Sequence, residues 1–232
     1  MPHHHHEAHF QSPEFVKDIV IGMADGLTVP FALAAGLSGA VDSSTIIITA
    51  GIAEIAAGSI AMGLGGYLAG RTEVDHYESE LQREYMEVDE FPDKERAEVV
   101  EVLEEFGLTK QSGISIVEEL SKDKDKWVKF MMRFELGLER PDEKRATKSA
   151  FNIGAAYIVG GLVPLAPYFF VKNSQQALFI SIGVTLVALF IFGFLKAKAI
   201  GQSTWSGAVK TTFIGALAAG VAFLLAKLIQ GY

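Results

Sequence analysis

The order of apolar and polar positions divides the sequence into five long apolar runs and one charged segment, which follows the second run. An α-helix rises about 1.5 Å per residue, so about 20 apolar residues cross a hydrocarbon layer about 30 Å thick. The pattern predicts an all-α integral membrane protein with five transmembrane helices. The predicted spans are 19–41, 45–70, 150–171, 177–195 and 208–228.

The charged segment predicts an acidic helical domain inserted between the second and third spans. The residues after Gly70 change from apolar to charged without a Gly or Pro, so the second span should continue as one helix into water. A domain of roughly 75 residues has a marginal hydrophobic core, to which bound metal or dimerisation would add stability. The predicted division is an N-terminal tail at 1–14, two spans at 15–70, the acidic domain at 71–148 and three spans at 149–232.

Turn and cap signals predict three shorter helices in the acidic domain. Asp93 follows a Phe-Pro turn and is the expected N-cap of a helix at 94–106, which Gly107 ends. The other two helices are expected from Ser112 or Ser115 to Leu120 and at 125–138.

Small residues predict close packing of the first two spans. Gly22 and Gly26 are four residues apart, as are Gly66 and Gly70. This spacing lets another helix approach closely, so the two spans are expected to pack on each other or on a second copy of the chain.

Basic residues in the short loops orient the spans. Lys196, Lys198 and Lys210 flank the connection between the fourth and fifth spans, whereas the first loop has no Lys or Arg and the third-to-fourth loop has only Lys172. The positive-inside rule then places the N-terminus and the acidic domain in the cytoplasm. The same spans suit a vacuolar membrane in a eukaryote and the plasma membrane in a bacterium. No signal peptide is predicted, and the His run at 3–6 is given no role.

Charge and cysteine content restrict the chemistry. Residues 71–148 hold 22 acidic and 14 basic side chains, which accounts for the whole formal charge of −8. Such a surface favours cations and argues against nucleic acid as a partner. Because the chain has no Cys, any metal must bind to oxygen, imidazole or thioether groups. No prosthetic group is predicted.

Two carboxylates, Asp25 and Glu54, lie inside the first two predicted spans. A charge in hydrocarbon costs about 2.5 to 3.5 kcal/mol on insertion scales, so such residues usually face a partner, a cavity or an ion path. Met62 follows Glu54 by eight residues, on a neighbouring part of the same helix face. Carboxylate oxygen together with thioether sulfur suits a divalent transition metal better than Mg²⁺ or Ca²⁺.

Each of these three residues also has a structural interpretation. Asp25 could cap a broken helix, Glu54 could be neutral and hydrogen-bonded to a neighbour, and Met62 could be ordinary packing. From their positions in antiparallel spans, Asp25 and Glu54 are expected at different depths.

The acidic domain carries rows of glutamates at helical spacing. Like charges one turn apart repel by a few tenths of a kcal/mol, a cost that a bound cation reverses, although a solvated acidic face is the alternative. The rows are Glu80, Glu84 and Glu87, then Glu95, Glu98, Glu101 and Glu105, and a later helix pairs Met131 with Glu135 beside Met132.

Three segments resemble the vacuolar iron transporter family. They are DGLTVPFALAAGLSG in the first span, AEIAAGSIAMGLGGYLA in the second, and the Glu-rich insert before the last three spans. The resemblance implies a homodimer of five-span subunits that exports ferrous iron in exchange for protons. It also implies that the first helices line the path at the dimer interface and that the cytoplasmic insert binds metal.

The resemblance implies specific site residues as well, and an insert that is accessory or regulatory. The pathway residues are Asp25, Glu54 and Met62. The metal ligands of the insert are Glu84, Glu87, Glu95, Glu98, Met131 and Glu135, with Met132 adjacent.

The sequence thus predicts a transporter and not an enzyme. The expected activity is Fe²⁺/H⁺ antiport from the cytosol into a vacuole or out of the cell, with Mn²⁺, Co²⁺ and Zn²⁺ as further candidate cargoes. One alternative is a membrane-anchored metal sensor or buffer that transports nothing. Another is an intramembrane hydrolase, which would need Asp25 and Glu54 within a few ångströms of each other.

Overall fold

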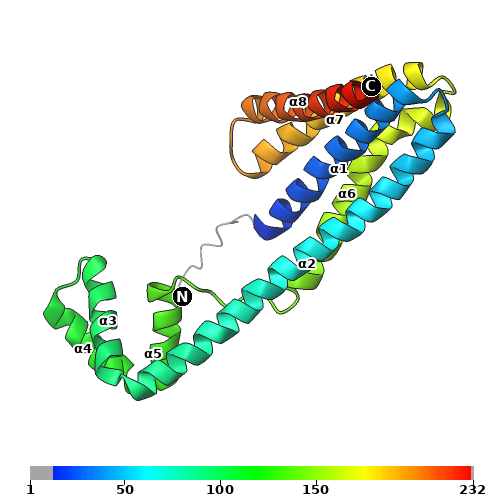
Figure 1. Ribbon diagram of the computed structural model, residues 1–232. Helices are drawn as coiled ribbons and strands as arrows, with labels where there is room; N and C mark the ends of the chain where they lie inside the picture. The colour runs from blue at the N-terminus through cyan, green and yellow to red at the C-terminus, as the bar shows by residue number, and fades with distance from the viewer. Residues whose placement is uncertain (1–12, 231–232) are drawn as a thin grey trace, which may run out of the picture. The chain divides into compact units, whose positions relative to one another are not determined.

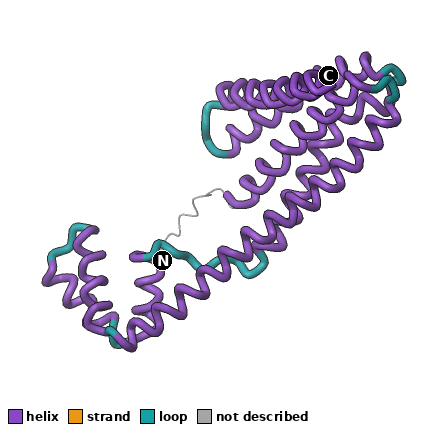
Figure 2. Tube along the Cα trace, in the orientation of Figure 1, coloured by secondary structure: helices purple, strands orange, loops and turns teal. Residues whose placement is uncertain are grey.

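The computed structural model describes residues 13–230, without the side chains of residues 13, 219, 222, 226, 227, 229 and 230. Nearly all of the tail predicted at 1–14, including the His run, lies outside the described residues. The described part consists of helices joined by loops (Figures 1 and 2). The helices are α1 (Pro13–Ala40), α2 (Ser44–Glu90), α3 (Pro92–Glu105), α4 (Lys110–Leu120), α5 (Lys124–Phe130), the π-helix η1 (Met131–Glu135), α6 (Arg145–Phe170), α7 (Ser174–Ala199) and α8 (Thr204–Gln230).

The chain forms two compact units, residues 1–67 with 147–232 and residues 68–146. Five of the described helices are long and apolar enough to cross a membrane. They are α1, α2, α6, α7 and α8, so the five predicted spans are confirmed as helices. The prediction that the second span continues as one helix is also confirmed, since α2 runs unbroken for 47 residues.

Close contacts with α6 hold α1 and α2 in the first unit. A Cβ atom on Gly22 would lie 2.3 Å from the carbonyl oxygen of Ile153, and one on Gly66 would lie 3.0 Å from Ser149 Oγ. The expected close approach at these glycines therefore occurs, but against α6. Elsewhere, α1 and α2 share a buried apolar cluster that includes Ala34 of α1 and Ile47 and Ile55 of α2.

Polar contacts fasten the α1–α2 connection to the α6–α7 connection. Ser43 and Asn173 form an antiparallel β-bridge. In the last turn of α1, the hydroxyls of Ser38 and Tyr168 lie 2.8 Å apart, and Gln175 donates its amide N–H to the carbonyl oxygen of Ser38. These contacts fix the register of the four helix ends.

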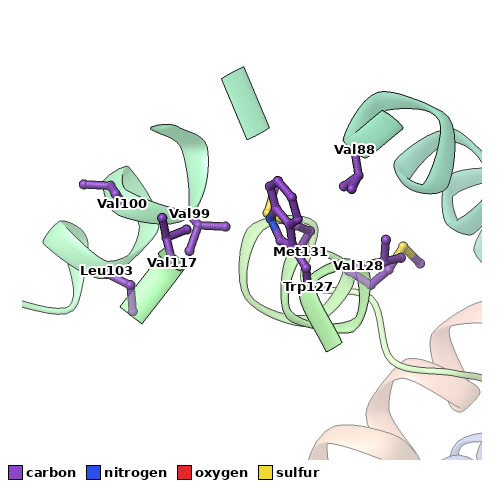
Figure 3. Close-up of a cluster of buried hydrophobic side chains, with 9 residues drawn as sticks. Val88, Val99, Val100, Leu103, Val117, Trp127, Val128 and Met131 are labelled. Atoms are coloured by element: carbon purple, nitrogen blue, oxygen red, sulfur yellow. The ribbon is translucent and has the colours of Figure 1, made fainter. Parts of the chain in front are cut away.

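The second unit has an apolar core built from all of its helices. Figure 3 shows Trp127 and Met131 between valines of α2 and α3. Its buried side chains are Val88, Val99, Val100, Leu103, Val117, Trp127, Val128, Met131 and Met132.

Three helix boundaries in this unit differ from the prediction. Helix α4 begins at Lys110 rather than at Ser112 or Ser115, and Thr109 is its N-cap. Helix α3 begins at Pro92 with Phe91 as its N-cap, and Asp93 instead accepts a hydrogen bond from Arg96. Pro is favoured at the first helical position, where its missing N–H has no helical partner anyway. The helix expected at 125–138 is α5 followed by a π-turn, in which the Leu136 N–H bonds the Met131 carbonyl at 3.1 Å.

Candidate functional site

Three glutamates of the acidic unit converge on one point. Glu84 and Glu87 stand three residues apart on α2, and the turn at Phe91 brings Glu95 of α3 back beside them. One carboxylate oxygen of each lies within 4.8 Å of the other two. Three carboxylates at this separation can supply the oxygen ligands of a divalent cation.

Two of these carboxylates are almost fully buried. Glu84 is 2% exposed and Glu95 is 1% exposed. Within the described part of the chain, Glu84 Oε2 and Glu95 Oε1 have no hydrogen-bond partner. Buried carboxylate oxygens are normally satisfied, so a cation is a natural partner for these two.

Burial and mutual repulsion perturb the acidity of the cluster. Burial raises the pKa of Glu84 to about 7, and Glu135, Glu95 and Glu87 add to the increase. Burial likewise raises the pKa of Glu95 to about 7, with further contributions from Glu98 and Glu87. The pKa of Glu135 is raised mainly by its desolvation and further by the negative charge of Glu98. All five predicted glutamates therefore interact electrostatically.

Two basic side chains partly neutralise the rim of the cluster. Lys94 Nζ lies 2.9 Å from Glu98 Oε1 and 3.9 Å from Glu95 Oε1. Arg83 lies 3.8 Å from Glu87 Oε2, with its closer partner at Glu80. Both basic side chains are exposed, so each can swing away from the cluster into water.

Met131 and Met132 are buried in the apolar core shared with α2 and α3. Consecutive residues on a regular helix point about 100° apart, and the π-turn of η1 accommodates both in the core. The structure thus gathers the glutamates into one cluster and places both methionines in the core of the same unit.

In the membrane unit, Glu54 of α2 is held by one residue of α6. The hydroxyl of Tyr157 donates a hydrogen bond to Glu54 Oε1. Among the described residues, the buried Glu54 Oε2 has no partner. Met62 is half-buried two turns further along α2.

Asp25 of α1 is half-buried and lines a cavity of about 300 Å³ between α1, α7 and α8. Lys196, at the end of α7, and Thr28 line the same cavity. The next residue, Gly26, packs against the backbone of Tyr157, whose carbonyl oxygen would lie 2.4 Å from a Cβ there. The Glu54 side chain of α2 and the glycine of α1 that follows Asp25 therefore both contact Tyr157.

Comparison with known proteins gives the family. The sequence model of the VIT family matches residues 16–227. The chain belongs to the VIT family. It is 52% identical over 228 residues to "Vacuolar iron transporter 1" of Oryza sativa subsp. japonica, covering 98% of this chain and 90% of that protein. It is 53% identical over 227 residues to "Vacuolar iron transporter 1" of Arabidopsis thaliana, covering 98% and 91%. It is 40% identical over 230 residues to "Protein CCC1" of Saccharomyces cerevisiae, covering 95% and 71%.

Two buried polar residues of this VIT family chain were not predicted from the sequence. Asp18 is 1% exposed and accepts hydrogen bonds from Ser149 Oγ at 3.0 Å and Asn152 Nδ2 at 3.3 Å. The first span was predicted at 19–41, which leaves Asp18 just outside it. Its seven-residue spacing from Asp25, which places both on one helix face, could have identified it.

Tyr157 is the second missed residue. It is 2% exposed and lies in the middle of α6. A single Tyr in an apolar run gives little signal, because a Tyr is common in membrane helices. Only the helix packing reveals that its hydroxyl meets a carboxylate of this VIT family chain.

Proposed function

We propose that the protein is a proton-coupled antiporter that moves Fe²⁺ from the cytosol into a vacuole or out of the cell. The observation that carries the proposal is the carboxylate of Glu54, which Tyr157 holds by one oxygen while the other is unpartnered among the described residues. Asp25, the second membrane carboxylate, directly precedes the glycine of α1 that packs on Tyr157. Membership of the VIT family and the names of its relatives support iron as the cargo. Mn²⁺, Co²⁺ and Zn²⁺ are further candidate cargoes, because oxygen and thioether ligands accept them too.

Proton coupling follows from competition at one carboxylate. A buried carboxylate favours its protonated form, whereas a divalent cation requires the charged form. Binding of Fe²⁺ at Asp25 or Glu54 therefore releases a proton, and reprotonation from the far side releases the metal. Met62 supplies a soft ligand further along α2.

The acidic unit collects metal for the pathway or regulates it. The buried cluster of Glu84, Glu87 and Glu95 supports this role, since unpartnered carboxylates of high pKa gain most from a cation. Glu98, Glu135 and the two methionines complete the proposed ligand set. We place this unit and the N-terminus in the cytoplasm.

The transporter is proposed to act as a homodimer. Helix α2 exposes small residues at four-residue intervals, and a Cβ on Gly65 would meet no atom within 4 Å. A row of this kind lets a second helix approach closely in lipid. The row is Ala53, Ala57, Ala61 and Gly65.

Uptake of Fe²⁺ into proteoliposomes with an acidic lumen tests the proposal. Uptake should be faster with the gradient than without it, and Asp25→Ala and Glu54→Ala should abolish it while the protein elutes as the wild-type oligomer. Glu119→Ala, on the exposed surface of α4, is the matched control and should transport normally. A membrane-anchored sensor or buffer, the alternative, would bind metal without flux, and all variants would then be equally inactive.

A further inference from the structure

Tyr157 contacts both pathway helices, at the Glu54 carboxylate of α2 and at the glycine that follows Asp25 on α1, without belonging to the proposed ligand set. It is 2% exposed, and its hydroxyl donates to Glu54 across 103 residues of sequence. A buried tyrosine hydroxyl needs a partner, and a charged acceptor makes the stronger bond.

Two glycines beside the carboxylates make room for this tyrosine. A Cβ on Gly58, one turn after Glu54, would lie 2.4 Å from Tyr157 Cζ and from its hydroxyl oxygen. A Cβ on Gly26, directly after Asp25, would lie 2.4 Å from the Tyr157 carbonyl oxygen. Any larger residue at either position would displace Tyr157, so both pathway helices are shaped around it.

The hydrogen bond also leaves Glu54 with one oxygen occupied and one available. Tyr157 binds Oε1, while the buried Oε2 has no partner among the described residues. A carboxylate held in this way cannot rotate freely, and its second oxygen has a fixed direction.

We infer that Tyr157 is a positioning residue for transport, which fixes the orientation of Glu54 and ties it to the segment of α1 that carries Asp25. The inference rests on the proposed function, because it assigns Glu54 to the cation path. Tyr157 acts through Glu54 and need not touch the cation itself.

Fe²⁺ uptake by Tyr157→Phe, with Tyr168→Phe as the matched control, tests the inference. Both tyrosines are on α6 and both are 2% exposed. Each variant loses one side-chain hydrogen bond, but the hydroxyl of Tyr168 pairs with Ser38 and not with a carboxylate. Because Phe keeps the ring, both variants should retain the oligomer and similar unfolding temperatures. Tyr157→Phe should raise the KM for Fe²⁺ about tenfold, the order expected for a lost hydrogen bond to a charged group, and Tyr168→Phe should leave it unchanged.

A Glu54→Asp background separates positioning from a general packing effect. The shorter carboxylate cannot reach the tyrosine hydroxyl, so adding Tyr157→Phe should change KM less than twofold. Equal KM values for the two Tyr→Phe variants would overturn the inference, and so would an undiminished effect of Tyr157→Phe in the Glu54→Asp protein. Absence of Fe²⁺ flux in the wild-type protein would instead overturn the proposed function.

Discussion

Glu84 on α2 and Glu95 on α3 place carboxylate oxygens within 4.8 Å of each other while both side chains are at most 2% exposed. Two negative charges in this position repel each other and lose hydration. The metal-free unit therefore favours proton uptake, whereas a bound cation favours the ionised pair.

The stability of the metal-free acidic unit should fall as pH rises. Glu84 and Glu95 have a pKa of about 7 in the folded protein, above the usual value of 4.5. The folded state thus holds more protons, so its stabilisation is complete below about pH 4.5 and is lost as pH rises to about 7. In the presence of a chelator, the acidic unit of the full-length protein should unfold at a lower temperature at pH 8 than at pH 5.5.

Trp127 in the core of this unit provides the signal for that measurement. The chain has two Trp residues, so Trp205→Phe leaves Trp127 as the single fluorophore. Glu84→Gln with Glu95→Gln should remove most of the pH dependence. If the protein that keeps both Glu84 and Glu95 unfolded at the same temperature at both pH values, the raised pKa of these two residues would be contradicted.

Removal of one buried glutamate should weaken metal binding more than it slows saturated transport. Glu95→Gln leaves three-carboxylate coordination incomplete, and the affinity for Mn²⁺ measured by Trp127 fluorescence should fall at least about tenfold, as loss of one charged ligand implies. Uptake at saturating Fe²⁺ should remain near wild type if the unit is accessory. Glu119→Gln is the exposed control, and equal affinities in both variants would exclude the cluster as the site.

Alanine at Gly26 should destabilise the membrane unit. The added Cβ would lie 2.4 Å from the Tyr157 carbonyl oxygen, and backbone cannot move aside easily. Overpacking of this kind costs about 1–3 kcal/mol. Gly183 on α7 is the control, because a Cβ there meets no atom within 4 Å. In detergent, the unfolding temperature of Gly26→Ala should be lower than that of the wild-type protein, while that of Gly183→Ala should be unchanged. Equal unfolding temperatures for the two variants would argue against the α1–α6 contact.

Cysteines at positions 43 and 173 should form a disulfide. Residues opposite each other in an antiparallel bridge have Cα atoms about 4.5–5.5 Å apart, within the range that a disulfide spans. The chain has no natural Cys, so Ser43→Cys with Asn173→Cys is the sole pair present. Mild oxidation should shift its mobility on a non-reducing gel. Ser43→Cys with Lys198→Cys should not cross-link, because Lys198 lies at the opposite end of α7 from Asn173.

The hydrophobic pattern was sufficient to predict the number and order of the spans, because hydrocarbon thickness sets their length. It was less informative about where helices end. Helix α1 begins at Pro13, before the predicted residue 19, since its first turns are helical but not apolar. The π-turn at Met131 was missed because one extra residue in a turn leaves the apolar spacing almost unchanged.

The candidate residues were predictable where a charge was out of place, as with Asp25 and Glu54. Their common neighbour was not, because the hydrogen bond from Tyr157 depends on the register between α2 and α6, which no local pattern encodes. The glutamate cluster was predictable as rows of like charge, whereas the burial of Glu84 and Glu95 depends on how α3 folds back onto α2.

Simultaneous recording of Fe²⁺ uptake and lumenal pH in one set of proteoliposomes tests the central claim most directly. If Asp25 and Glu54 exchange metal for protons, addition of Fe²⁺ should make an acidic lumen more alkaline in step with metal uptake, and Glu54→Gln should abolish both signals. Metal uptake by the wild-type protein without any change in lumenal pH would contradict the account.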